Sequence, residues 1–253
     1  QPSMSFQRKL WQPSFYWTGD QPAWPCSCGG KLKLKNLVAL ETEESKKAKA
    51  SEAWMIEWIT YRVRADLVCT GCGDTGFACG QAVLEQDEED QTGENYDKKV
   101  SLHYLDPSPE LFPIPESCPS EVRELLLQAF ELYWKHPSSA GARARAALEA
   151  LLDDQKVARG IRKKGVEYKR HNLHRRLEIF KSKSPSRERI FNRLMAVKWI
   201  GNSGAHESIE HEDVLDVLEL LHSALNLLYV KSEEALDKKA KKIIARKGRK
   251  PKP

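Results

Sequence analysis

The sequence has 253 residues, of which 40% are hydrophobic and 30% are charged, and its formal net charge is +5 at pH 7. This composition is typical of a globular protein and leaves room for one large domain or two small ones. No run of about 18 apolar residues occurs, so we expect no transmembrane helix and no membrane partner. Because no basic-then-apolar leader opens the sequence, we expect a cytoplasmic protein.

The charge is distributed unevenly along the chain. Residues 156–189 contain thirteen Lys and Arg against three Asp and Glu, and residues 231–253 contain ten against three. Basic segments of this kind favour a polyanionic partner, most simply nucleic acid. For residues 238–253 a solvated tail is an equal alternative. The segment 156–189 is more informative, because it lies between predicted core helices.

The N-terminal part carries the pattern of a β structure. Alternation of apolar and polar residues predicts strands at 31–35, 61–68, 77–84 and 100–105. Residues 41–53 are rich in Lys, Glu and Ala and predict either an exposed helix or a loop. Several prolines within residues 107–119 then predict an extended linker, because the residue before a proline disfavours helix.

After the prolines the apolar period changes from two to 3.6. This period predicts helices that contain residues 122–133, 144–151, 173–180, 190–197 and 214–228. Residues 154–170 are polar and basic and contain two glycines, so we predict a loop there. The helical segments together predict a bundle of four or five helices.

Two short cysteine pairs predict a metal site. Cys26-x-Cys28 and Cys69-x-x-Cys72 are each followed by glycine. Four thiolates of this kind can surround one Zn²⁺ tetrahedrally, which leaves no open position for water and makes the ion structural rather than catalytic. Cys79 can replace one of the four ligands, or it can be a buried strand residue.

The segment Lys198–His206 carries the second candidate site. On a helix, Lys198, Asn202 and His206 lie four residues apart and share one face. An imidazole, an amide and an ammonium group on one face can serve phosphodiester chemistry. The alternative is a helix end that glycine terminates, with Asn202 and His206 as capping residues.

Two stretches of the sequence resemble the HEPN superfamily. They are residues 140–153 (AGARARAALEALLD) and 196–206 (AVKWIGNSGAH), and the resemblance covers residues 100–230, roughly. The branch that they resemble is bacterial, has no assigned function, and often carries an N-terminal zinc-binding segment and a Pro-rich lead-in. The resemblance implies a helical bundle that is commonly dimeric. It also implies a metal-independent ribonuclease of a toxin or antiviral system, because many members have that activity.

The resemblance places particular residues in a ribonuclease site. Arg145 and Glu149 match the first motif of the family, and the second motif is matched by Gly201, Asn202, Ala205 and His206. In the implied mechanism the substrate's 2′-hydroxyl attacks the adjacent phosphorus, His206 acts as base or acid, and Asn202 orients the substrate. Lys198 or Arg145 holds the phosphate. Lys198 replaces an arginine of the family, and a lysine offers a point charge instead of a bidentate fork.

These observations predict an α+β fold with four parts. The parts are a small N-terminal zinc-ribbon-like β domain (1–106), a Pro-rich linker (107–119), an all-α HEPN-type helical bundle (120–236) and a basic tail (237–253). We predict a HEPN-type, metal-independent ribonuclease in phage defence or a toxin system, with structural Zn²⁺ at Cys26, Cys28, Cys69 and Cys72. The predicted partners are RNA rather than DNA and a second copy of the chain, as a homodimer. The alternative is a non-catalytic nucleic-acid-binding or nucleotide-binding adaptor that partners a nuclease or restriction system.

Overall fold

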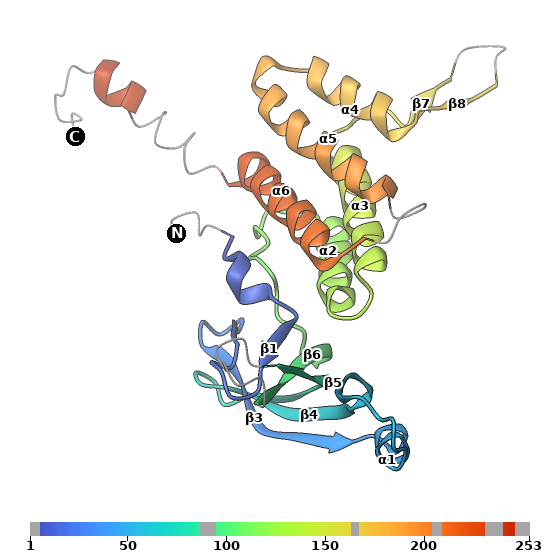
Figure 1. The fold of residues 1–253 in the computed structure, drawn as a ribbon. Coiled ribbons are helices and arrows are strands. Elements are labelled where there is room, and N and C mark those ends of the chain that lie inside the picture. The colour runs from blue at the N-terminus through green and yellow to red at the C-terminus, as the bar shows by residue number, and fades with distance from the viewer. Residues whose placement is uncertain (1–5, 87–94, 163–166, 204–208, 231–239, 246–253) are drawn as a thin grey trace.

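The structure is a computed structural model, and it describes residues 6–86, 95–162, 167–203, 209–230 and 240–245. For residues 201–203 only the helical backbone is described. The N-terminal half is built around a β-sheet and the C-terminal half from helices, and the two halves pack against each other (Figure 1).

The N-terminal half forms one six-stranded antiparallel sheet. Its strands are β1 (Ser14–Tyr16), β2 (Ala23–Pro25), β3 (Lys31–Glu41), β4 (Thr60–Cys69), β5 (Thr75–Gln86) and β6 (Tyr96–Asp106). They lie in the order β1-β6-β5-β4-β3-β2 and curve into an open half-barrel. The predicted fold class, a small zinc-ribbon-like β domain followed by an all-α HEPN-type bundle, is therefore wrong. The sheet is much larger than a ribbon, and its four long strands have 10–12 residues each.

Two bulges explain why the sequence pattern underestimated the sheet. The pairing register shifts between Lys35 and Val38 of β3, and again where β5 pairs with β6 at Cys79 and Gly80. A bulge adds one unpaired residue, so the inward and outward positions exchange along the strand. The alternation from Lys31 therefore ends at Lys35, although the strand continues to Glu41.

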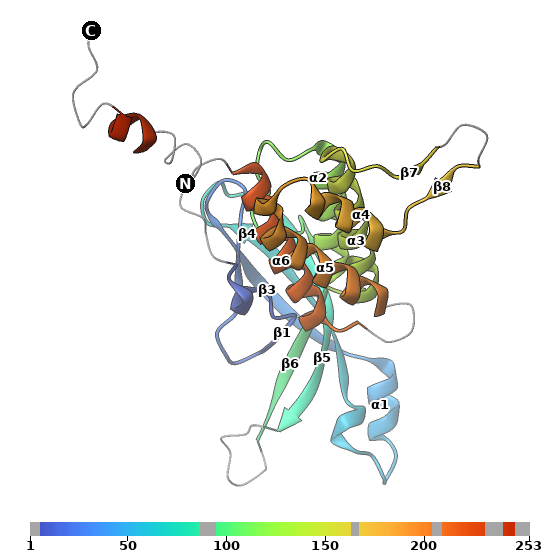
Figure 2. The same cartoon turned by 90° about the horizontal axis from the view of Figure 1, so that it is seen from above.

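The sheet has one apolar face and one solvent-facing face. The apolar face contributes the following buried side chains: Leu34, Val63, Ala65, Leu67, Ala78, Ala82, Val100, Leu102 and Leu105. The helices of the C-terminal half all lie on this side of the sheet (Figures 1 and 2). Residues that alternate with the buried ones, such as Arg64 on β4 and Phe77 on β5, are exposed on the opposite face.

The connection between β3 and β4 contains the short helix α1 (Glu43–Lys49) and a 3₁₀ turn (Ile56–Trp58). The hydroxyl of Thr42 caps α1 by accepting a hydrogen bond of 3.2 Å from the N–H of Ser45. Of the two predicted alternatives for residues 41–53, the structure shows the helix. Figure 2 shows that α1 projects beyond the end of the sheet.

Residues 120–229 form the helical half. Its helices are α2 (Ser120–Tyr133), α3 (Pro137–Asp154), α4 (Leu173–Ser182), α5 (Glu188–Ser203) and α6 (His211–Tyr229), with a 3₁₀ turn at Pro185–Arg187. Pro137 opens α3 at a position where the missing N–H costs little. A capping box between Glu210 and Asp213 opens α6. None of the helices in the described part of the chain combines the length and the apolar character that a membrane span requires.

A small hairpin occupies part of the segment that we predicted as a loop. Its strands are β7 (Gly160–Ile161) and β8 (Lys169–Arg170). Only its two ends are described, because residues 163–166 lie outside the described part of the chain. The hairpin connects α3 to α4 and lies far from the sheet (Figure 1).

The sheet and the helices share one hydrophobic core. Trp24 of β2 meets Trp134, just after α2, edge to face, with ring centroids 5.5 Å apart. The hydroxyl of Tyr133 donates a buried hydrogen bond of 2.5 Å to the carbonyl of Trp11. The predicted linker also belongs to this core. It forms neither helix nor strand over residues 107–119, all of which are described, but five of its side chains are buried: Pro109, Leu111, Phe112, Ile114 and Cys118.

Candidate metal centre and arginine groove

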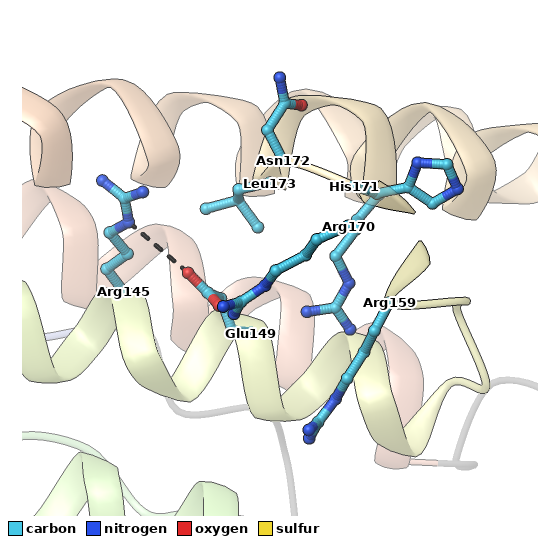
Figure 3. A pocket seen from close by; sticks show the side chains of 8 residues that line it. Arg145, Glu149, Arg159, Arg170, His171, Asn172 and Leu173 are labelled. Atoms are coloured by element: carbon cyan, nitrogen blue, oxygen red, sulfur yellow. Dashed lines mark ion pairs between the residues drawn. The ribbon is translucent and has the colours of Figure 1, made fainter. Parts of the chain in front are cut away.

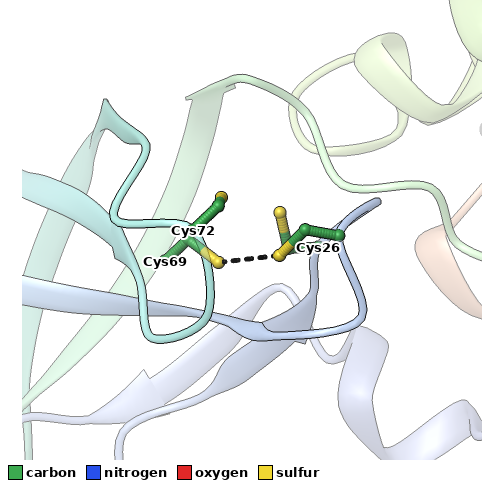
Figure 4. A group of neighbouring side chains, drawn as sticks. Cys26, Cys69 and Cys72 are labelled. Carbon is green, nitrogen blue, oxygen red and sulfur yellow. Dashed lines mark hydrogen bonds between the residues drawn. The ribbon is translucent and has the colours of Figure 1, made fainter.

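Four cysteines from two separate turns come together at one end of the sheet. Cys26 and Cys28 lie in the turn between β2 and β3, and Cys69 and Cys72 lie where β4 turns into β5 (Figure 4). Their four Sγ atoms all lie within 4.8 Å of one another, and those of Cys28 and Cys69 are 3.4 Å apart. Four thiolates at about 2.3 Å from a tetrahedral Zn²⁺ have sulfur–sulfur distances of about 3.8 Å. This cysteine cluster is therefore spaced to hold one metal ion.

Glycines allow the two turns of the cysteine cluster to approach closely. The N–H groups of Gly30 and Gly71 each donate a hydrogen bond of 3.3 Å to the sulfur of the cysteine two residues earlier. A Cβ atom on Gly30 would lie 2.7 Å from the backbone nitrogen of Gly71, so a side chain there would force the turns apart. Gly29 and Gly73 have φ angles of +87° and +73°, which glycine adopts without strain.

Backbone amides change the proton affinity of the cluster. The N–H groups of Cys72 and Gly71 lower the pKa of the Cys69 thiol to about 6. The N–H of Asp74 lowers the pKa of the Cys72 thiol. The sulfurs of Cys69 and Cys28 outweigh that effect and raise this pKa to about 12. The Cys69 thiolate is thus stabilised at neutral pH, whereas Cys72 holds a proton that a cation can displace.

The other two cysteines lie outside the cluster. Cys79, the predicted substitute ligand, is exposed on β5, on the sheet face opposite the core, and is not one of the four clustered thiols. Cys118 is buried before α2, and burial raises the pKa of its thiol to about 11. The ligand set that the structure brings together is the predicted one of Cys26, Cys28, Cys69 and Cys72.

The second candidate site is a groove along α3 that arginines line. Two adjoining pockets, of about 350 and 440 Å³, share five lining residues: Arg145, Glu149, Arg159, Arg170 and Arg176. We call these two pockets the arginine groove. Its side chains converge from α3, from the β7–β8 hairpin and from α4 (Figure 3). Four guanidinium groups face three lining carboxylates, those of Glu121, Glu149 and Asp153, so the groove carries a net positive charge.

The most buried arginine of the groove is Arg176, whose side chain is only 5% exposed. Its Nη2 donates a hydrogen bond of 2.5 Å to Asp153, and Arg159 donates two more, of 2.9 and 2.6 Å, to the same carboxylate. The hydrogen bonds from Arg159, and then the charge of Arg176, hold the pKa of Asp153 below its usual range. The buried Nε of Arg176 has no hydrogen-bond partner within the described residues. A buried donor without an acceptor is costly, so we expect an oxygen atom of a ligand or of water there.

The start of α4 completes one end of the groove. His171, Asn172 and Leu173 line this end. The side chain of Asn172 caps α4 by accepting a hydrogen bond of 2.8 Å from the N–H of Arg175. The N–H of His171 donates to the carbonyl of Arg159 at 2.8 Å, which closes the base of the hairpin just before α4. The first turn of a helix carries a partial positive charge, so this end adds to the attraction for an anion.

The structure brings two of the predicted catalytic residues into the groove. Arg145 and Glu149 lie one turn apart on α3 and form an ion pair of 3.8 Å (Figure 3). Both side chains line both pockets. The first motif of the HEPN resemblance therefore lies in the arginine groove.

The second motif is described only in part. Lys198 lies on α5, is 9% exposed, and places its Nζ 3.8 Å from the ring centroid of its neighbour Trp199. It is not among the residues that line either pocket. The side chain of Asn202 and the whole of His206 lie outside the described residues. The predicted grouping of Lys198, Asn202 and His206 thus stays a prediction.

The sequence pattern does not show that Arg159, Arg170 and Arg176 form one group. The charge of residues 156–189 did indicate a polyanionic partner, but the predicted loop left these arginines without positions. Their common position depends on the pairing of Gly160 with Arg170 in the β7–β8 hairpin. Strands of two residues are too short to show a period, so only the concentration of arginine was available as a signal.

Two parts of the chain match families without an assigned function. Residues 128–246 match a domain of unknown function (DUF4145), and residues 14–111 match another domain of unknown function (DUF8608). No curated protein and no solved structure matches the chain. The four groove arginines fall within the first match and the four clustered cysteines within the second. The matches assign no activity to either site.

Proposed function

We propose that this chain binds RNA through the arginine groove. The observation that carries the proposal is the buried Arg176, whose Nε has no partner within the described residues and which lies beside three further arginines. Guanidinium groups bind phosphate oxygens through paired, charge-assisted hydrogen bonds. Asp153 and Glu149 hold Arg176, Arg159 and Arg145 in place in the absence of a ligand. A phosphate can therefore bind to groups that are already oriented.

One feature favours a nucleic acid over a single small anion, and a second favours RNA over DNA. The groove extends over two adjoining pockets, and its arginines come from three separate elements, so it offers contacts to more than one phosphate. The resemblance of residues 140–153 and 196–206 to the HEPN superfamily favours RNA over DNA, because many of its members act on RNA.

Fluorescence polarisation with a labelled single-stranded RNA tests this proposal. We expect Arg170→Glu and Arg145→Glu each to weaken binding about 10-fold or more, because each replaces a cation with an anion inside the groove. Arg143→Glu is the matched control, because Arg143 is exposed on the same helix and does not line either pocket. An equal loss in all three variants would show that overall charge, rather than the groove, binds the RNA.

For the cysteine cluster we propose Zn²⁺ in a structural role. Four thiolates complete a tetrahedral shell and leave no position at which the ion could activate water. The backbone N–H groups of Gly30 and Gly71 support the thiolates of the cluster. Elemental analysis of the purified protein should find one zinc ion per chain, and a preparation that is fully folded without zinc would contradict the proposal.

RNA cleavage is a second candidate function, favoured by the presence of Arg145 and Glu149 in the groove. In the proposed reaction the 2′-hydroxyl loses its proton and attacks the adjacent phosphorus, and the bond to the 5′-oxygen breaks. His206 would take the first proton or give one to the leaving 5′-oxygen. Asn202 would orient the phosphate, and Lys198 or Arg145 would stabilise its charge. Two copies of the chain would form the cleft as a homodimer.

Incubation of the protein with single-stranded RNA in EDTA tests cleavage. We expect products that end in a 2′,3′-cyclic phosphate, complete loss of cleavage in His206→Ala and a smaller loss in Asn202→Ala. Lys198→Arg should keep or raise the activity, since it restores a bidentate contact to phosphate. If the wild type binds RNA without cleaving it and Lys198→Arg gains nothing, the chain acts as the binding adaptor instead. Light scattering that finds only monomers would count against a shared cleft.

A further inference from the structure

An exposed aromatic pair lies on the sheet face opposite the core. Phe77 on β5 is 50% exposed and Tyr104 on β6 is 49% exposed. Their ring centroids are 5.6 Å apart and their planes differ by 34°. In the strand pairing Tyr104 lies directly opposite Cys79, so the two rings are diagonal neighbours on one face. Two adjacent rings that remain half exposed offer apolar surface that the core does not use.

Several basic side chains lie on the same sheet face as this aromatic pair, and the direct strand partners of Phe77 are Asp66 and Asp106. Exposed cations of the same face include Lys33 and Lys35 on β3 and Arg62 and Arg64 on β4. Within the described residues, none of the four forms an ion pair or a side-chain hydrogen bond. The acidic residues in the same rows are Asp66 and Asp106, and the carboxylate of Asp66 accepts a hydrogen bond of 2.7 Å from Asn36. In the two rows that hold the rings, Lys35 and Arg64 balance these two carboxylates, and the excess of cations comes from Lys33 and Arg62 in the rows on either side.

The small side chain of Cys79 lies between Arg64 and the Tyr104 ring. Cys79 pairs with Arg64 on one side and with Tyr104 on the other, so these three residues form one row across the sheet. A flat group that rests on the Tyr104 ring would extend over Cys79 and bring an attached anion close to Arg64. The spacing of charge and ring thus matches a ligand that repeats an anionic group and a planar group.

We infer that this sheet face, the aromatic platform of Phe77, Tyr104, Arg62 and Arg64, binds single-stranded nucleic acid. Unpaired bases stack on exposed aromatic rings, and the backbone phosphates between them meet the neighbouring cations. A duplex fits poorly, because its bases are already stacked and paired inside the helix. The aromatic platform is a different surface from the arginine groove, so this inference stands whether or not the groove binds RNA.

Oligonucleotide binding tests the aromatic platform. The probes are a labelled oligouridine and an oligothymidine of about 12 nucleotides, within the site size of known single-strand-binding folds, and a duplex of equal length. Phe77→Ala and Tyr104→Ala should each weaken single-strand binding about 10-fold, since each removes one stacking surface. Tyr96→Ala is the matched control, because Tyr96 lies at the other end of β6 and is 43% exposed.

A second ligand separates this site from the arginine groove. Inorganic polyphosphate carries the charge of a nucleic acid but no bases, so its binding should not change in Phe77→Ala or Tyr104→Ala. Arg170→Glu, which alters the groove, should leave the 10-fold effect of the ring variants in place. The aromatic platform is ruled out if the ring variants bind single strands as the wild type does, or if they lose polyphosphate binding equally.

The exposed thiol of Cys79 provides a readout in the unmutated protein. An excess of the single strand should slow alkylation of Cys79 by N-ethylmaleimide several-fold, as measured by mass spectrometry, and Cys79→Ser identifies the modified site. Unchanged alkylation at a saturating strand concentration would overturn the inference. So would a wild-type dimer that Phe77→Ala converts to monomers, because the rings would then be covered by a second copy of the chain.

Discussion

The cysteine cluster and the arginine groove hold groups of like charge together in different ways. In the cluster, the four thiols come from two turns, and the N–H groups of Gly30 and Gly71 donate hydrogen bonds to two of the sulfurs. In the groove, Asp153 and Glu149 lie between the arginines and neutralise part of their charge. The cluster therefore needs a cation to hold its deprotonated form together, whereas the groove is assembled before its ligand arrives. Loss of the metal ion should therefore unfold the turns that hold the cysteine cluster, whereas loss of the groove ligand should leave the arginine groove folded but empty.

The largest expected effect comes from removal of one ligand of the cluster. Cys72→Ser should abolish metal binding and lower the free energy of unfolding by several kcal/mol, which corresponds to a fall in Tm of about 10 °C or more. Thermal unfolding followed by circular dichroism, together with the zinc content, measures both effects. Cys79→Ser is the control, because Cys79 is an exposed thiol outside the cluster. An unchanged Tm in Cys72→Ser would mean that the cluster is not a structural metal site.

An intermediate effect is expected from the carboxylate that organises the groove. Asp153→Asn should lower the free energy of unfolding at pH 7 by about 2 kcal/mol, because it leaves the buried Arg176 without its charged partner. The pKa of Asp153 is lowered in the folded state, so its contribution is fully present above the unfolded value of about 4 and is lost as the pH falls below it. The difference between variant and wild type should therefore shrink below pH 4, roughly.

Urea unfolding at a series of pH values measures this difference. Glu124→Gln is a suitable control, because Glu124 is an exposed carboxylate on α2. A stability difference that stays constant from neutral to acidic pH would show that Asp153 contributes through packing rather than through charge.

The smallest effect concerns the contact between the two halves. Tyr133→Phe keeps the ring but removes the hydrogen bond to the carbonyl of Trp11. We expect a loss of about 1 kcal/mol, or a Tm lower by about 3 °C, because the buried carbonyl loses its donor. Differential scanning calorimetry resolves a change of this size. A more stable Tyr133→Phe protein would mean that the hydrogen bond does not compensate for the burial of the hydroxyl.

The elements that follow a simple period could be predicted from the sequence. Residues 61–68, 77–84 and 100–105 lie within β4, β5 and β6, and the predicted helical segments lie within or overlap α2 to α6. The cysteine ligands were also predictable, because each pair lies within one turn and glycine follows it. These features depend on neighbours within a few residues, which is the range that a sequence pattern reports.

The features that depend on distant contacts were not predictable. The bulges in the long strands disrupt the alternation, so the sheet was predicted too small and the fold class was wrong. The arginine groove joins Arg145 on α3 to Arg170 on β8 and Arg176 on α4, and no spacing in the sequence encodes that approach. The aromatic platform likewise required the strand register, which aligns Phe77 and Tyr104 on one face.

The edge-to-face contact of Trp24 with Trp134 limits how the halves of this chain can be recombined. Each tryptophan belongs to a segment that matches a separate family, yet both are buried and their rings contact each other. A chimaera that joins residues 14–111 to a foreign helical half must therefore supply an aromatic edge for Trp24. Without one, the sheet would expose a large apolar ring and lose solubility before either site could be assayed.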